Sequence, residues 1–290
     1  MNRATDILLT AMAPAIWGST YYVTTEFLPD GYPVTVSMLR TLPAGLFLLL
    51  LVRRLPPLSF IGKVSLLGVL NFTIFQSMLF AAAYRLPGGV AATVGAVQPL
   101  FVILIAYLAI CTKIRTLSVI AAAGGIAGVA LLVLTPEAAL DPIGIAAGLA
   151  GALSMAGGTV LSRKWKPDVS PLAFTAWQLT AGGVLLVPLA LWMEPPLPPL
   201  SGTNIMALSY LCLIGAAFTY VLWLRGVGRM EPSAASTLGF LSPATALVLG
   251  WALLEQHVSP LQGLGILVVL GSVWLGQNPG SRAQLAAAAS

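Results

Sequence analysis

Residues 84–99 read YRLPGGVAATVGAVQP, and residues 228–243, which lie 144 positions later, read GRMEPSAASTLGFLSP. Both stretches hold an arginine in second place, an alanine, a threonine and a glycine at alternate positions in the middle, and a proline at the end. A shift of 138 positions also pairs Pro33 with Pro171 and Gly45 with Gly183. Because the matches keep their order at a nearly constant offset, they predict an internal duplication.

The composition excludes a water-soluble fold for these two copies. Hydrophobic residues make up 58% of the 290 positions and charged residues only 8%, whereas soluble domains carry roughly 25% charged residues. So few polar groups could not cover a soluble surface, but lipid solvates the apolar excess. The sequence therefore predicts a multi-pass membrane protein whose main partner is the lipid bilayer.

Proline-rich breaks divide the chain into apolar runs. Residues 28–31, 53–57 and 195–199 would each resist a continuing helix. The run that follows Arg3 is longer than the apolar core of a signal peptide, so we interpret it as a retained first helix. A helix needs about 20 apolar residues to cross a bilayer. By this measure we predict spans over residues 6–27, 33–52, 64–84, 88–111, 116–134, 142–162, 171–193, 204–224, 232–254 and 260–277.

Each copy then holds five helices, and an odd number brings the second copy into the bilayer from the opposite side. We predict an all-α integral membrane fold of ten transmembrane helices, arranged as two inverted five-helix repeats around a central cavity. The first repeat covers residues 1–138, the second covers residues 139–280, and residues 281–290 form a C-terminal tail.

The basic residues predict the orientation. Cytoplasmic loops are enriched in lysine and arginine, and cytoplasmic termini put 12 of the 14 basic residues on that side. Arg85 falls outside, and Arg40 falls within a span. We therefore expect a plasma (inner) membrane protein with both termini in the cytoplasm. The basic residues on that side are Arg3, Arg53, Arg54, Lys63, Lys113, Arg115, Arg163, Lys164, Lys166, Arg225, Arg229 and Arg282.

Other function classes find little support in the sequence. The net charge of +5 is spread through loops in twos and threes, which favours cytoplasmic loops over nucleic-acid binding. Cys111, Cys212 and His257 are isolated from one another, so we expect no metal site and no cofactor. An enzyme would need a nucleophile with a base, a metal cluster or paired acids, and the predicted spans contain no such set.

Further short motifs recur in order along both copies. The first copy holds Trp17-Gly18-Ser19, Arg40, Gly89-Val90-Ala91-Ala92, Gln98-Pro99-Leu100 and Gly128-Val129, and the second holds Pro232-Ser233-Ala234-Ala235, Ser242-Pro243, Gly250, Glu255 and Gly263. In this order they resemble the drug/metabolite transporter superfamily, specifically its EamA family, over nearly the whole chain.

Within that family the chain is most similar to the YddG-type exporters of aromatic amino acids. This resemblance implies ten helices around a central cavity that opens alternately to each side of the membrane. The second copy departs from the pattern at Ser154 and Gln178, where the first copy has Trp17 and Arg40. We therefore expect the two halves to contribute unequally to a substrate site.

Polar side chains within the predicted spans are candidates for substrate binding. A charge such as Arg40 costs about 2.5–3.5 kcal/mol at the centre of a membrane helix. Two interpretations stay open: Arg40 binds a carboxylate or phosphate of the substrate, or it is a structural arginine bonded to helix-end carbonyls. Gln76, Gln98 and Gln178 are amides that suit a zwitterionic substrate, although amides also bond neighbouring helices.

Aromatic side chains form the second group of candidates. Trp17 and Tyr21 share one helix face at a spacing of four, and Tyr220 lies in a later span. Flat side chains of this kind stack on a substrate ring or hold its apolar part. The alternative is that they anchor helices at the membrane interface.

Two proline breaks occupy matching places in the two copies. Pro99 follows Gln98, and Pro243 follows Ser242. Paired breaks near the midplane indicate a substrate site in transporters, because they free backbone groups there. We therefore predict a conformational role for Pro99 and Pro243, and a central cavity lined by Trp17, Gln98, Tyr220 and Ser242.

Together these features predict a transporter, working as a monomer, that exports small amphipathic metabolites by alternating access. Amino acids, including aromatic ones, are the expected substrates. A channel or a non-transporting scaffold is the alternative outside carriers. Within carriers, a nucleotide-sugar exchanger would hold several central basic residues and a multidrug cation exchanger an acid in the first helix. The chain offers Arg40 in the centre and Glu26 near a predicted outer end.

Overall fold

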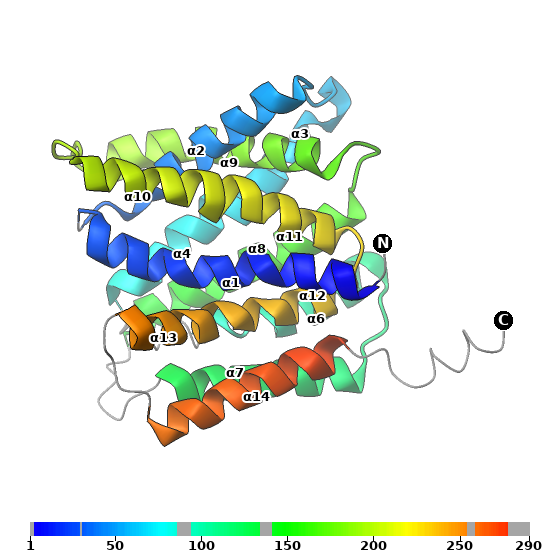
Figure 1. Ribbon diagram of the computed structural model, residues 1–290. Helices are drawn as coiled ribbons and strands as arrows, with labels where there is room; N and C mark the ends of the chain where they lie inside the picture. Colours follow the sequence, from blue (N-terminus) through cyan, green and yellow to red (C-terminus); the bar gives the residue numbers. More distant parts are fainter. Residues whose placement is uncertain (1–2, 30, 86–93, 134–140, 254–258, 278–290) are drawn as a thin grey trace.

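The computed structural model describes residues 3–29, 31–85, 94–133, 141–253 and 259–277 of the chain. Every regular element in these ranges is a helix, which confirms the predicted all-α class (Figure 1). Seven helical segments among the described residues are long and apolar enough to cross a bilayer. Their length and composition support the prediction of a multi-pass membrane protein.

The described helices of the first half fall within or overlap the predicted spans, and the predicted start of the fourth span at residue 88 lies outside the described residues. The third span is one helical run in which a π-helical segment, η1, separates α3 from α4. The predicted start of this span at residue 64 is six residues too late, because the helix continues through Lys63 to Leu58. The elements are α1 (Arg3–Phe27), α2 (Pro33–Val52), α3 (Leu58–Gly68), η1 (Val69–Ile74), α4 (Phe75–Arg85), α6 (Gln98–Ile110) and α7 (Thr116–Val133).

The second half has the same order of helices. Its third run again contains a π-helical segment, η2, and a short 3-10 turn, η3, lies within its fourth run. The elements are α8 (Pro142–Lys164), α9 (Pro171–Met193), α10 (Gly202–Cys212), η2 (Leu213–Phe218), α11 (Thr219–Val227), α12 (Pro232–Thr237), η3 (Leu238–Phe240), α13 (Leu241–Leu253) and α14 (Pro260–Gln277).

Proline chemistry sets several of the helix ends. The predicted breaks at residues 28–31, 53–57 and 195–199 lie between helices, which confirms them. Pro33 and Pro171 occupy the first turns of α2 and α9. At that position the missing N–H of proline costs no helical hydrogen bond.

Asp141 begins α8 and carries an ion pair. Its carboxylate accepts a hydrogen bond from the Ile143 N–H at 2.8 Å, and Arg85 from the end of α4 lies 3.2 Å away. These two groups, the backbone N–H first and the guanidinium second, hold the pKa of Asp141 below its ordinary value. The ends of α4 and α8 are therefore fixed to each other by charge as well as by packing.

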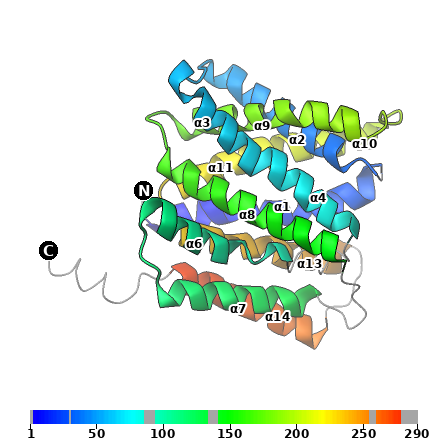
Figure 2. The ribbon, with the colours of Figure 1, turned by 180° about the vertical axis from the view of Figure 1, so that it is seen from behind.

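The packing of helices follows one pattern in both halves (Figures 1 and 2). Helix α1 of the first half lies against α11 and α13 of the second, and α8 of the second half lies against α4 and α6 of the first. Two further pairs join helices at the same place in each half: α2 packs along α9, and α7 packs along α14. Each half is thus built into the other rather than standing as a separate lobe.

The α2–α9 pair depends on two glycines. A Cβ atom on Gly45 would lie 2.8 Å from the carbonyl carbon of Leu179, and one on Gly183 would lie 2.6 Å from the Cα of Leu42. Both distances are too short for a real side chain. Gly45 and Gly183 are the pair related by the shift of 138 positions, so the predicted repeat coincides with the closest approach of these helices.

The two π-helical segments also coincide with the repeat. Val69–Ile74 and Leu213–Phe218 are related by a shift of 144 positions, the offset found between residues 84–99 and 228–243. A π turn displaces the regular hydrogen-bond ladder of a helix, and such turns cluster at functional sites. Segment η1 packs against α9, and η2 packs against α2.

The two ends of the described chain lie together. The Arg3 guanidinium, at the start of α1, donates to the carbonyl oxygen of Gln277 at the end of α14. Figure 1 shows the N-terminus and the end of α14 at the same end of the bundle.

The glycine contacts generate a stability prediction. In an exposed helix, alanine in place of glycine stabilises by about 1 kcal/mol, but Gly45→Ala and Gly183→Ala should each destabilise the protein by about 1–3 kcal/mol through overpacking. Gly62→Ala in α3 is the control, because nothing lies within 4 Å of its added Cβ. Thermal unfolding of the detergent-solubilised protein measures the difference. Equal midpoints for Gly45→Ala and Gly62→Ala would contradict the close crossing.

Candidate substrate site

Arg40 lies at the centre of the molecule, where α2 meets η2. Its side chain is buried, and one guanidinium nitrogen donates to the carbonyl oxygen of Gly215 at 2.9 Å. Gly215 belongs to the π-helical segment, where the displaced ladder makes a backbone carbonyl available to a side chain. This contact is of the kind expected for a structural arginine, but a guanidinium has five N–H donors and can hold a carbonyl and a carboxylate together.

A chain of hydrogen bonds joins Arg40 to Trp17. The indole N–H of Trp17 donates to Thr219 Oγ1 at 2.9 Å, and the Thr219 hydroxyl donates to the same Gly215 carbonyl at 2.8 Å. The network connects α1, α2 and the α10–η2–α11 run. Thr219 was not singled out in the sequence, since threonine is common in membrane helices and its partners come from distant segments.

Gln178 occupies the corresponding place in the other half. The side-chain amide of Asn71, in η1, donates to Gln178 Oε1 at 2.8 Å, and the Ser162 hydroxyl donates to the same atom at 3.2 Å. The shift of 138 positions relates Arg40 to Gln178, and the shift of 144 positions relates Asn71 to Gly215. The two polar residues that the sequence set apart therefore bond the two π-helical segments.

Aromatic rings gather beside this network. The ring centroids of Trp17 and Tyr220 lie 4.9 Å apart, and those of Tyr220 and Phe72 lie 4.7 Å apart in an edge-to-face arrangement. Trp223 lies 5.3 Å from Trp17. The hydrogen bonds through Gly215 and Thr219 link Arg40 to Trp17. The structure thus connects Arg40 with Trp17 and, through the Trp17 ring, with Tyr220.

Gln98 and Pro99 lie at the first turn of α6, away from the aromatic cluster. Gln98 lines a small cavity of about 30 Å³ between α4 and α8. Phe75 lines the same cavity and also packs against the central hydrophobic cluster that contains Trp17. Phe75 therefore lies between the small cavity that Gln98 lines and the cluster that contains Trp17.

Ser242 and Pro243 begin α13 at its crossing with α1. A Cβ atom on Gly18 would lie 2.6 Å from the carbonyl oxygen of Ser242, so α1 and α13 touch through their backbones here. This contact puts Ser242 next to Trp17 along α1. The side chain of Tyr21 lies outside the described residues.

Several buried polar atoms have no hydrogen-bond partner within the described part of the chain. Gln76, at the start of α4, is 1% exposed, and the shift of 144 positions relates it to Tyr220. Buried polar atoms usually find a partner in the protein, in water or in a ligand. The atoms concerned near the α2–α9 crossing are Gln76 Oε1, Gln178 Nε2, Ser37 Oγ, Thr41 Oγ1 and Thr180 Oγ1.

Comparison with known proteins finds one family. The EamA-like transporter family matches residues 5–134 and again residues 142–276. Protein PecM of Dickeya dadantii is 40% identical over 268 residues, which cover 92% of this chain and 90% of that protein. YedA of Escherichia coli K12, described as an uncharacterized inner membrane transporter, is 30% identical over 90% of this chain and 86% of its own length.

A solved crystal structure shares the fold. It superposes with a TM-score of 0.81 and covers 95% of this chain and 98% of its own. The sequence identity is 19%, so this likeness concerns the arrangement of the helices alone.

The Trp17–Thr219–Gly215 network generates a second prediction. Thr219→Val keeps the side-chain shape but leaves the Trp17 indole N–H without its acceptor, and it should lower stability by about 1–2 kcal/mol. Thr180→Val is the matched control, because the Thr180 hydroxyl oxygen is buried without a partner among the described residues. Thermal unfolding should rank Thr219→Val below Thr180→Val. The reverse order would exclude a contribution of this network to stability.

Proposed function

The chain belongs to the EamA-like transporter family, and from this premise we propose that it exports small amphipathic metabolites, amino acids with aromatic side chains among them, by alternating access. Membership of the family makes the protein a multi-pass membrane transporter. The substrate class, the direction and the mechanism are the proposed part.

The observation that carries the proposal is the hydrogen-bonded link from Arg40 to Trp17, whose ring packs on Tyr220. A guanidinium binds a carboxylate with charge-assisted hydrogen bonds, and two aromatic rings suit an apolar or aromatic side chain. The buried amides of Gln76 and Gln178 can each donate to or accept from a zwitterion. This combination supports the YddG-type specificity suggested by the sequence motifs.

We also propose that the chain forms ten transmembrane helices in two inverted repeats, residues 1–138 and 139–280. Three observations support it: the family matches twice, the π-helical segments recur at one offset, and the helix contacts of one half mirror those of the other. Inverted repeats put the substrate site near the midplane at their interface. The crossing of α2 and α9 lies at such an interface.

The proposed orientation has both termini in the cytoplasm of a cell whose inner membrane holds the protein. The contact between Arg3 and Gln277 fits an even number of crossings, and the distribution of basic residues favours the cytoplasm for this end. The relative YedA is named as an inner membrane protein, which agrees with the proposed membrane.

Cysteine labelling checks the orientation. On a background without Cys111 and Cys212, a cysteine at Lys164 should resist an impermeant maleimide in intact cells and react after permeabilisation. A cysteine at Pro198, in the exposed segment after α9, should react in intact cells. External labelling at Lys164 would invert the proposed topology.

Replacement of Arg40 checks the substrate class. Arg40→Gln, which copies the residue of the second repeat, should weaken phenylalanine transport about tenfold, since it removes a charge-assisted contact to the carboxylate. Transport of the amide analogue of phenylalanine should fall less. Counterflow into proteoliposomes measures both and requires a carrier, because a channel or scaffold gives no counterflow.

The matched control is Arg54→Gln, which removes an exposed arginine charge while keeping the backbone carbonyl that accepts from Trp177. It should leave both transport rates unchanged. Equal losses for phenylalanine and its amide in Arg40→Gln, or a collapse of folded protein, would assign Arg40 a structural role instead.

A further inference from the structure

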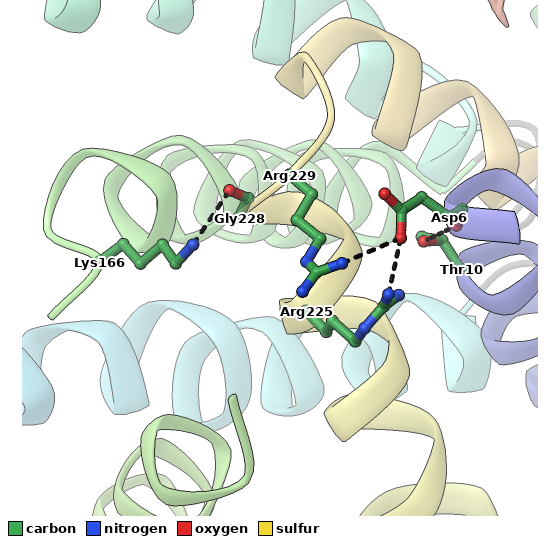
Figure 3. Close-up of polar contacts among 6 residues, drawn as sticks. All are labelled: Asp6, Thr10, Lys166, Arg225, Gly228 and Arg229. Carbon is green, nitrogen blue, oxygen red and sulfur yellow. Dashed lines mark hydrogen bonds and ion pairs between the residues drawn. The ribbon is translucent and has the colours of Figure 1, made fainter. Parts of the chain in front are cut away.

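Three basic side chains surround a cavity at the end of the bundle that holds the N-terminus. The cavity measures about 240 Å³ and lies between the end of α11 and the segment that joins α8 to α9. Lys166, Arg225 and Arg229 line it, together with the acid Asp168. Figure 3 shows Lys166 directed at the Gly228 carbonyl, and Arg225 and Arg229 directed at Asp6.

Two arginines of the cavity wall already bind a carboxylate, that of Asp6, which does not itself line the cavity. Arg225 pairs with Asp6 Oδ1 at 2.7 Å, and Arg229 lies 3.4 Å from the same oxygen. The side chains of Arg225 and Asp6 are 13% and 16% exposed, so this pair is largely shielded from solvent. The Thr10 hydroxyl donates to the backbone carbonyl of Asp6 (Figure 3). Asp6 is therefore an internal carboxylate bound by two guanidinium groups.

Lys166 places a third positive charge at the cavity, because its side chain packs against Gly228. A Cβ atom on Gly228 would lie 3.2 Å from Lys166 Cδ, so the lysine stem lies across the bare backbone at the end of α11. Its ammonium group is 3.5 Å from the Gly228 carbonyl oxygen. The absence of a side chain at residue 228 thus lets the lysine reach the cavity wall, as Figure 3 shows.

Among the described residues, the corresponding acid at the opposite end of the bundle pairs with a single arginine. There Arg85 pairs with Asp141 at 3.2 Å, and the shift of 144 positions relates Arg85 to Arg229. The same shift relates Arg225 to Ala81, a partly buried apolar residue. Within the described part of the chain, Asp141 therefore pairs with one guanidinium group and Asp6 with two.

We propose that this cavity is a capture site for an anionic group, a carboxylate or a phosphate, which takes the place of Asp6 on Arg225 and Arg229. Binding exchanges the Asp6 carboxylate on the two guanidinium groups for the oxyanion of the ligand, and the displaced Asp6 carboxylate turns to solvent. Release of Asp6 frees the start of α1 from the end of α11. Anion binding is inferred from the positions of Arg225, Arg229 and Asp6 alone. The further role, capture of a transported substrate, rests on the proposed function.

Equilibrium binding tests the proposal without any transport. The full chain with Arg40→Gln, which removes the guanidinium of the proposed substrate site, is placed in nanodiscs of neutral phosphatidylcholine, and binding of 3-phenylpropionate is compared with that of its amide in this background. The carboxylate should bind and the amide should not. Arg225→Gln should weaken binding about tenfold by removing a charge-assisted contact. Asp6→Asn should strengthen binding several-fold, since it removes the competing carboxylate while keeping both guanidinium groups.

Asp141→Asn is the matched control, because it breaks the equivalent ion pair at the opposite end and should leave binding unchanged. A parallel arm uses discs that contain phosphatidylglycerol. If the anionic lipid raises the unfolding midpoint of the wild type but not of Arg225→Gln, and 3-phenylpropionate does not bind, the site stands and its ligand is a lipid headgroup.

Two results would overturn the proposal. One is equal binding by the Arg40→Gln background, Arg225→Gln and Asp6→Asn, and the other is a loss of binding in Asp6→Asn. If Arg225→Gln does not fold, Asp6→Asn decides alone, because a merely structural ion pair gives no gain in affinity when one partner is removed. Failure of phenylalanine counterflow would contradict the proposed function and leave this binding result intact.

Discussion

The close crossing of α2 and α9 is the contact on which the rest of the structure depends. Helices in lipid gain little from the hydrophobic effect and associate through close packing and polar bonds. Gly45 and Gly183 supply the packing by removing the side chains that would hold the two backbones apart. Once this crossing is fixed, η2 lies along α2 and η1 lies along α9. Arg40 and Gln178 then reach partners in those π-helical segments and avoid lipid.

The same crossing explains how a charged residue can be both structural and functional. Insertion of an arginine into a membrane helix costs a few kcal/mol, and a backbone carbonyl such as that of Gly215 offsets part of this cost without adding a second charge. The Gly215 carbonyl also accepts from Thr219, whose hydroxyl accepts from the Trp17 indole, so the same contact ties Arg40 to α1.

The sequence predicted those features that depend on local chemistry. Proline breaks, span lengths and the Gly45–Gly183 pair could be predicted from short patterns. The structure confirms the breaks and shows each glycine close to the backbone of the opposite helix. Tertiary partners could not be predicted in this way. Phe72 is one apolar residue among many in its span, and a π turn has no residue signature. The sequence singled out Gln98 by its proline neighbour, but its neighbours around the small cavity come from α4 and α8, which no local pattern specifies.

Sequence divergence between the halves makes the two ends of the molecule chemically different, which a perfect duplication could not do. Two identical inverted copies would give a molecule with equivalent ends and no preferred side for capturing a ligand. Here two positions that the repeat relates differ in charge. Arg40 of the first half corresponds to Gln178, and Arg225 of the second half corresponds to Ala81. Gly215, which holds Arg40, and Arg225 both belong to the α10–η2–α11 run. They are ten residues apart, which is about 15 Å along a helix. This run thus carries Arg225 itself and the carbonyl that holds Arg40 of α2, so a small rotation of the run against α1 would shift both contacts together.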